Sequence, residues 1–342
     1  MRSSLLADAP AIREPQHAPV AHVTRGGVIE GVHYGSVVVL GGNGDVRLSI
    51  GDIEAACYPR SALKPVQALA MVRAGLPLDG ALLSLSMGSH SGEEHHLAGT
   101  RLILELAGLT EDDLRNVPDV PYAPAVRDAW VREGRGPSRL AQNCSGKHAA
   151  MLYLCKLAGW PLESYLDPGH PLQRAIAEVI EEVTGQHIAN VTVDGCGAPL
   201  FAVSLHGLAR AAARIATAGP DTAGRRVANA LRIHPEMASG TGRDTAQLMR
   251  AVPGLLAKDG FEGVQVAALP DGRAVAVKIA DGADRARIPV TAAALARAGV
   301  EPRLLAGFEG EPMTGGGRPV GGIRPVAALN PPSVPATATA TA

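Results

Sequence analysis

The stretch from Ser36 to Gly51, SVVVLGGNGDVRLSIG, decides the fold prediction. Two apolar, β-branched runs, 37–40 and 46–50, flank GGNGD, whose glycines and asparagine favour a tight hairpin turn. A second hairpin is predicted over 263–282, GVQVAALPDGRAVAVKIADG, around its PDG turn. Helical periodicity dominates between the two hairpins. This order predicts an α+β fold, in which N- and C-terminal strands pair in one mostly antiparallel sheet.

The predicted domain organisation follows from this order. We expect a single domain over 19–328, with the sheet built from about 19–60 and 260–328 and a helical lobe over about 61–255. The helical patterns include SALKPVQALAMVRAG and APLFAVSLHGLARAAARIATAG, and NVTV reads as a short strand. Residues 1–18 and the Pro-, Ala- and Thr-rich tail 329–342 offer little to bury, so both are expected to be disordered.

Composition excludes several classes of function. The 342 residues include 46% hydrophobic residues, which is enough for a large core, and only 3% aromatic residues. Net charge is −1, from 32 basic and 33 acidic residues, so neither nucleic acid nor a membrane surface is an expected partner. The first residues lack a sustained apolar run typical of a signal peptide, which favours the cytoplasm. The four cysteines are then expected as thiols or metal ligands.

Residues 60–64, RSALK, are the first candidate for catalysis. Residues three apart on a helix share a face, so Lys64 can reach the Ser61 hydroxyl. A serine nucleophile needs a base, and a lysine serves as one only when its pKa is lowered by burial or by another cation. The alternative is a serine at a helix start with a solvated lysine.

Lys278 is the candidate for that second cation. It interrupts the β-branched run AVAVKI, and a lysine in a buried central strand is costly unless it has a role. The alternative is an edge-strand lysine that points to solvent and hinders aggregation.

The segment 86–96, SMGSHSGEEHH, combines hydroxyls and imidazoles. Ser89 could relay a proton to a leaving group. Ser91, three residues before Glu94, has the spacing of a capping box. His95 and His96 are adjacent and should diverge on a helix, which makes them a poor pair of metal ligands.

Two short turns place cysteines beside other polar groups: NCSGKH over 143–148 and DGCG over 194–197. Cys144 and Cys196 would supply half of a four-ligand zinc site. From residue chemistry alone His148 could be a third ligand, and Asp194 a ligand or an orienting group. Lys147 is a less usual candidate because an amine binds metal only when neutral.

Taken together, these motifs resemble the rhizobial-type L-asparaginases, the asparaginase II family. The stretches that carry the resemblance run in family order from about residue 20 to 326: RSALKPVQA, SHSGE, NCSGKHAAML, DGCGAPLFAVSL, HPEMASGTGRDT, GVQVAALPDGRAVAVKIADGADRA and VGGIRP. The combination of RSALKP, NCSGKH and DGCG is specific, although each motif alone is weak.

The resemblance implies a fold like that of serine β-lactamases and glutaminases, and hydrolysis of the side-chain amide of L-asparagine to L-aspartate and ammonia. It implies two Ser–Lys pairs, a zinc site and a homodimer. The residues that it implies are Ser61 with Lys64 and Ser89 with Lys278 for catalysis, Cys144, Lys147 and Cys196 for Zn²⁺, and Arg60, His148 and Asp194 for substrate.

Three rival functions are kept at this point. A glutaminase differs by one methylene of substrate, which usually gives only about 1–3 kcal/mol of discrimination. A penicillin-recognising serine hydrolase would share S-x-x-K and a strand lysine. A non-catalytic zinc-dependent binding protein would bind metal without turnover.

Overall fold

The computed structural model describes residues 14–330 and has an α+β fold. An eight-stranded sheet runs in the order β10-β11-β1-β2-β9-β8-β7, with β3 paired to β2. Every neighbouring pair in it is antiparallel. Its strands are β1 (Ala18–Arg25), β2 (Val28–Leu40), β3 (Val46–Ile50), β7 (Leu256–Gly260), β8 (Val264–Ala268), β9 (Ala274–Ile279), β10 (Met313–Gly315) and β11 (Arg318–Pro325).

Both predicted hairpins are present. Val37 pairs with Ile50 between β2 and β3, and Ala268 pairs with Ala274 between β8 and β9. The N-terminal strands join the C-terminal ones through β2 with β9 and β1 with β11. The expected mostly antiparallel sheet built from both ends of the chain is therefore confirmed.

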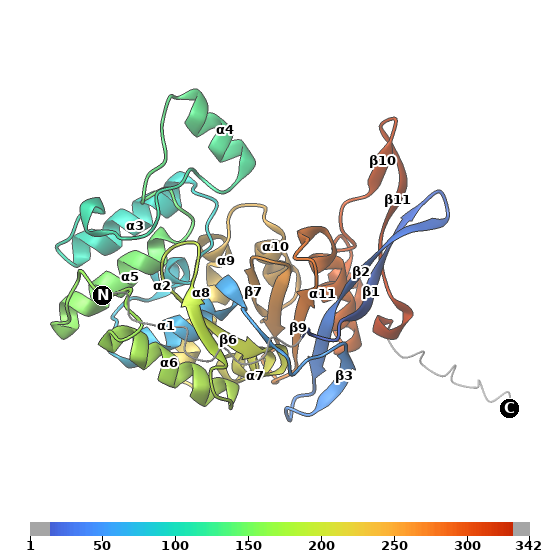
Figure 1. Ribbon diagram of the computed structural model, residues 1–342, viewed down its shortest axis with the longest axis horizontal. Coiled ribbons are helices and arrows are strands. Elements are labelled where there is room, and N and C mark those ends of the chain that lie inside the picture. The colour runs from blue at the N-terminus through green and yellow to red at the C-terminus, as the bar shows by residue number, and fades with distance from the viewer. Residues whose placement is uncertain (1–13, 331–342) are drawn as a thin grey trace, which may run out of the picture.

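The helices lie between these strands in the sequence and form a lobe beside the sheet (Figure 1). Helices α7 and α11 pack against the central strand β9. The longer helices are α1 (Lys64–Arg73), α2 (Gly80–Ser86), α3 (Glu94–Leu106), α4 (Pro124–Arg132), α5 (Ser145–Ala158), α6 (Pro171–Thr184), α7 (Leu205–Ala216), α8 (Ala223–Ile233), α10 (Asp244–Ala251) and α11 (Arg287–Arg297). The short helical segments are η1 (Arg60–Leu63), η2 (Glu111–Asp113), α9 (Pro235–Ala238), η3 (Asp284–Ala286), η4 (Pro302–Leu305) and η5 (Ala327–Leu329).

One predicted helix is partly a strand. The first half of APLFAVSLHGLARAAARIATAG forms β6 (Pro199–Ser204), which pairs with β4 (Ala56–Cys57) and β5 (Asn190–Val193) in a second, three-stranded sheet. All six residues of β6 are buried. A short, fully buried apolar run has no periodicity that separates a strand from a helix.

Strand β7 begins at Leu256, directly after the predicted helical lobe and before the predicted start of the C-terminal part of the sheet at about 260. It forms the edge of the large sheet next to β8, and its last residue lies against the turn that carries Ser61. A Cβ on Gly260 would lie 2.3 Å from the carbonyl oxygen of Pro59, a contact that only glycine avoids. The closeness of the two backbones therefore requires the glycine at this position.

The predicted domain limits shift slightly where the structure describes them. Strand β1 starts at Ala18, and His17 contacts the Ser36 hydroxyl at 3.0 Å, so the structured part begins before residue 19. Leu329 is fully buried, one residue into the predicted tail. The remaining predictions of disorder, for 1–13 and 331–342, lie outside the described residues. Within 14–330, no helix combines the length and the apolar character needed to cross a membrane.

Candidate functional site

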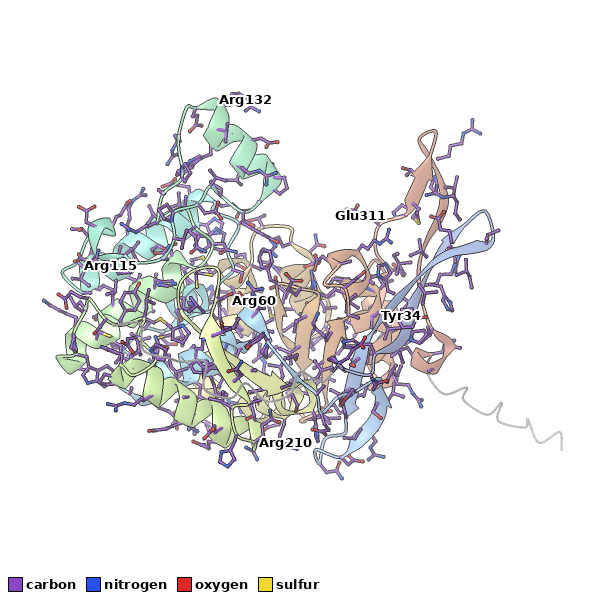
Figure 2. All side chains as sticks on the ribbon, viewed as in Figure 1. Tyr34, Arg60, Arg115, Arg132, Arg210 and Glu311 are labelled. Atoms are coloured by element: carbon purple, nitrogen blue, oxygen red, sulfur yellow. The ribbon has the colours of Figure 1, made fainter. Side chains whose placement is uncertain are left out.

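Two adjoining cavities lie where the helical lobe meets the sheet. One, of about 220 Å³, is lined by Arg60, Ser61, Cys144, Asp194 and Cys196 among others. The second, of about 270 Å³, is lined by Ser89, Arg243 and Asp259 among others. Tyr122 and Phe261 line both, with their rings edge to face at 5.8 Å between centroids. Arg60 marks this region near the centre of the molecule in Figure 2.

The turn that presents Ser61 is strained. Arg60 has φ of +53°, a left-handed conformation that is rare outside glycine and clusters at functional sites. Its guanidinium Nε donates to Asp194 Oδ1 at 2.8 Å, and the group also lies over the Phe261 ring. These contacts hold the turn in place. The side chain of Ser61 is largely buried but reaches the 220 Å³ cavity.

Lys64 is buried at the start of α1, and its ammonium contacts three groups from two segments. It donates to the carbonyl oxygen of Gly88, to Ser89 Oγ at 3.2 Å and to Cys144 Sγ at 3.1 Å. No hydrogen bond joins it to Ser61 within the described chain. The structure thus brings Lys64 together with Ser89, whereas the sequence paired Lys64 with Ser61 and Ser89 with Lys278.

Lys278 does not take part in this cluster. Its Nζ donates to the carbonyl oxygens of Glu262 at 2.7 Å and Ile279 at 2.5 Å. It lines a different cavity, of about 520 Å³, beside Cys57 and Ser36. The predicted pairing of Lys278 with Ser89 is therefore wrong. In the sheet, Lys278 of β9 is paired with Val264 of β8, and its ammonium binds backbone carbonyls there instead of joining the cluster around Lys64.

Lys258 on β7 is the second lysine of the cluster. It is 1% exposed, and its Nζ contacts Asp259 Oδ1 at 2.6 Å and the Asp259 carbonyl at 2.8 Å. Burial and the neighbouring charge of Lys64 together lower the pKa of Lys258 to about 8, although Asp259 acts in the opposite direction. Sequence reasoning missed Lys258. The available signal was the sequence Lys258-Asp259-Gly260 directly before a predicted strand.

Asp259 compensates the basic groups around it. Its carboxylate also accepts from Arg243 at 3.0 Å, and Arg243 donates in turn to the Ser89 carbonyl at 2.6 Å. Burial opposes ionisation of Asp259, but Lys258 and Arg243 outweigh it and hold its pKa well below the ordinary value. Lys258 is thereby linked to the Ser89 carbonyl through the Asp259 carboxylate and the Arg243 guanidinium.

The segment that carries Ser89 is fixed by its backbone. Ser89 N–H donates to the Ala238 carbonyl and Ser91 N–H to the Ser239 carbonyl. The capping role predicted for Ser91 is wrong, because Glu93 is the N-cap residue of α3 and the Ser91 hydroxyl has no partner within the described residues.

The two cysteine turns meet as the sequence predicted. Cys144 and Cys196 are both buried in one cluster, and Lys147 Nζ lies 3.3 Å from Cys196 Sγ. A hydrogen bond from the Cys144 thiol lowers the pKa of Cys196 to about 5, with Lys147 adding to the effect. That same hydrogen bond, together with burial, raises the pKa of Cys144 to about 12. Cys196 is thus the thiolate of the pair.

The third donor beside the two sulfurs is Lys147. Within 14–330, neither a histidine nor a carboxylate comes within 4.8 Å of both thiols to make a three-ligand set. His148 is fully buried and its Nδ1 contacts the Tyr165 hydroxyl at 2.7 Å, while its Nε2 has no partner. Asp194 binds Arg60 and lines the 220 Å³ cavity. Burial acts to raise the pKa of Asp194, but the charges of Lys147 and Arg60 outweigh burial and keep this pKa below its usual value.

The donor set fits a zinc ion. In a tetrahedral site with Zn–S of about 2.3 Å and Zn–N of about 2.1 Å, neighbouring ligand atoms lie roughly 3.5 Å apart. The contact of 3.3 Å between Lys147 Nζ and Cys196 Sγ is close to that spacing. A bound zinc ion would displace the protons of the Cys144 thiol and the Lys147 ammonium, and the resulting two thiolates and one amine would leave one position for water.

The chain was compared with solved structures and with the sequences of known proteins. Among solved structures, a β-lactamase from Mycobacterium bovis is 16% identical with a TM-score of 0.43, over 78% of this chain and 95% of that one. A crystal structure of Mglu is 18% identical with a TM-score of 0.35, over 80% of this chain and 68% of that one. These likenesses are too weak to bear on function, and no curated protein sequence matches the chain.

The sequence profile of one family covers nearly all of the described chain. The L-asparaginase II profile matches residues 21–325, which include both strand hairpins, the cysteine turns and every residue of the two cavities. The chain therefore belongs to the L-asparaginase II family.

Proposed function

We propose that the protein hydrolyses the side-chain amide of L-asparagine to L-aspartate and ammonia at the two adjoining cavities. Family membership supports an asparaginase-type amidohydrolase. The observation that carries the proposal is the buried contact of Lys64 Nζ with Ser89 Oγ at 3.2 Å. Ser89 lines the 270 Å³ cavity, and Ser61, one turn before Lys64, lines the 220 Å³ cavity. A serine with a lysine in hydrogen-bond reach is the arrangement that acyl transfer needs.

Ser61 is the proposed nucleophile. It lines the smaller cavity, and Lys64 follows one turn later, at the C-cap of the 3₁₀ helix η1, where its backbone N–H donates to the Ser61 carbonyl. Lys64 takes the Ser61 proton as the hydroxyl attacks the amide carbon, and the Ser61 backbone N–H is the proposed oxyanion donor. Ser89 then relays the proton from Lys64 to departing ammonia, and water hydrolyses the acyl-enzyme.

Lys258 takes the role that was expected of Lys278. It is the second buried cation of the site, and the charge of Lys64 is one of the effects that lower the pKa of Lys258, after burial. The hydrogen bonds of Asp259 and Arg243 position Lys258 relative to the Ser89 backbone.

Arg60 and Asp194 suit the ends of an amino acid substrate. They lie side by side at the cavity that Ser61 lines, one cationic and one anionic, and together they match a free carboxylate and a free ammonium. His148 is buried behind them and we assign it to support of the site through Tyr165.

Zn²⁺ is proposed at Cys144, Lys147 and Cys196. When bound there it would tie the NCSGKH and DGCG turns together. The two sulfurs leave the metal little charge to spare, so these residues serve to orient substrate. The homodimer and the cytoplasmic location expected from the sequence stay predictions.

A glutaminase is the second candidate, because nothing at the cavity measures the length of the substrate side chain. The first test is ammonia release from L-asparagine and L-glutamine by the purified protein. We expect release from asparagine, with kcat/KM for glutamine lower by about 10- to 100-fold, the selectivity that one methylene allows. No release from either amide, with β-lactam acylation of Ser61 instead, would favour the penicillin-recognising hydrolase.

The nucleophile is tested by trapping. A diazoketone analogue of L-asparagine should label wild-type protein on the peptide that contains Ser61, as read by mass spectrometry. Ser61→Ala should lose the label and several orders of magnitude in kcat. Ser89→Ala should lose turnover but keep slow labelling at Ser61. Labelling on the Ser89 peptide, persisting in Ser61→Ala, would reverse the two roles.

The zinc assignment is tested by metal content and kinetics. Cys196→Ser and Lys147→Met should each lose one tightly held zinc per chain and raise KM more than they lower kcat. Cys57→Ser is the matched control, since this cysteine lies outside the site and a hydroxyl can keep its contact with the Val203 carbonyl. Unchanged zinc content in both site variants would contradict the assignment.

A further inference from the structure

A second cluster of metal-binding side chains lies at the start of α3, outside the catalytic groups. Its members are Glu93, His95 and His96, and one ligand atom from each lies within 4.8 Å of the others. The expected divergence of His95 and His96 is wrong: their ring centroids are 4.0 Å apart and tilted by 40°. The first turn of the helix lets both rings turn back toward the N-cap residue Glu93.

His96 has the hydrogen-bond pattern of a metal-binding histidine. It is fully buried, and its Nε2 lies 2.9 Å from the Glu236 carbonyl oxygen, which accepts a hydrogen bond. Nε2 therefore carries the proton, and Nδ1 keeps its lone pair without a partner among residues 14–330. A ring N–H on a backbone carbonyl commonly orients a ligating histidine.

Glu93 and His95 leave the cluster open to solvent on one side. Their side chains are 20% and 40% exposed, and His95 Nε2 lies 3.3 Å from a Glu93 oxygen. Glu93 also accepts from Thr241 N–H at 3.2 Å and from its hydroxyl at 2.9 Å, which still leaves lone pairs on the carboxylate. An ion can therefore reach the three donors from solvent.

His90 closes the inner side without being a ligand. Its ring stacks on His96 at 5.0 Å between centroids. Both of its nitrogens are engaged, one by the Gly92 N–H and the other by the Ser145 hydroxyl. The donor set is thus two imidazoles and one carboxylate.

We propose that Glu93, His95 and His96 form a binding site for a divalent first-row transition ion, with Zn²⁺ the reference ion and water in the remaining positions. Two histidines and one carboxylate are a common set for such ions. The bound ion would fasten the start of α3 to the loop that contains Thr241. That loop adjoins Ala238 and Ser239, which accept the backbone hydrogen bonds of Ser89 and Ser91. The site would therefore stiffen the segment that carries Ser89.

The test counts Zn²⁺ bound to metal-stripped protein by titration calorimetry. Wild type should bind two equivalents per chain, and His95→Gln one. His187→Gln is the matched control: this histidine is also exposed beside a glutamate, at 3.3 Å, but lacks a third donor, so two equivalents should remain. Zn²⁺ should also raise the melting temperature in Cys196→Ser, which lacks the thiolate site.

The two metal sites fail separately in this design. A variant that loses the Cys196 site should still bind one Zn²⁺ ion at the site that contains His95. A variant that loses the His95 site should still bind one Zn²⁺ ion at the site that contains Cys196. The proposal is overturned if His95→Gln binds as many Zn²⁺ ions as His187→Gln, or if both bind no more than the one equivalent that Cys196→Ser removes. If Cys196→Ser does not fold, the comparison of the two histidine variants still decides the question.

Discussion

Three lysine ammonium groups, those of Lys64, Lys147 and Lys258, are at most 2% exposed in the interior of this protein. Removing an ammonium from water costs several kcal/mol unless anions or hydrogen-bond acceptors replace the lost hydration. The surroundings supply these partners unequally. Lys258 has the Asp259 carboxylate, Lys147 has the Cys196 thiolate, and Lys64 has a carbonyl, a hydroxyl and a thiol. The arrangement of the candidate site follows from this compensation.

The partners of Lys64 and Lys147 come from segments that the fold must bring in from elsewhere, whereas Asp259 directly follows Lys258. Strand β7 carries Lys258 and Asp259 and ends at Gly260, which lies against the Pro59 backbone just before Ser61. The NCSGKH turn opens α5, and the DGCG turn follows β5. Arg60, directly before Ser61, joins that turn to the DGCG turn through its contact with Asp194, and its backbone is left-handed. Strain of this kind persists only where the surrounding structure over-determines it.

Local patterns predicted much of this. The two hairpins, the S-x-x-K turn and the meeting of Cys144 with Cys196 all follow from turn chemistry, spacing or motif. What could not be read from sequence is which lysine faces Lys64. Lys278 stands in a strongly β-branched strand and drew attention, whereas Lys258 stands in LAKDG, a five-residue strand without alternation. Only the sheet register separates them, since Lys258 pairs with Val266 and Lys278 with Val264. Likewise, adjacency argued against His95 and His96 as neighbours, because helix geometry sets Cβ directions and leaves ring positions open.

The most direct test of this account compares Lys258→Met with Lys278→Met for ammonia release from L-asparagine, with folding of both verified by circular dichroism. Methionine keeps the length of the side chain and removes only the charge and the amine. The account predicts that Lys258→Met loses turnover by at least about 100-fold, the usual scale for a proton-transfer group. Lys278→Met should keep nearly native turnover. An active Lys258→Met beside an inactive, folded Lys278→Met would contradict the placement of the second lysine.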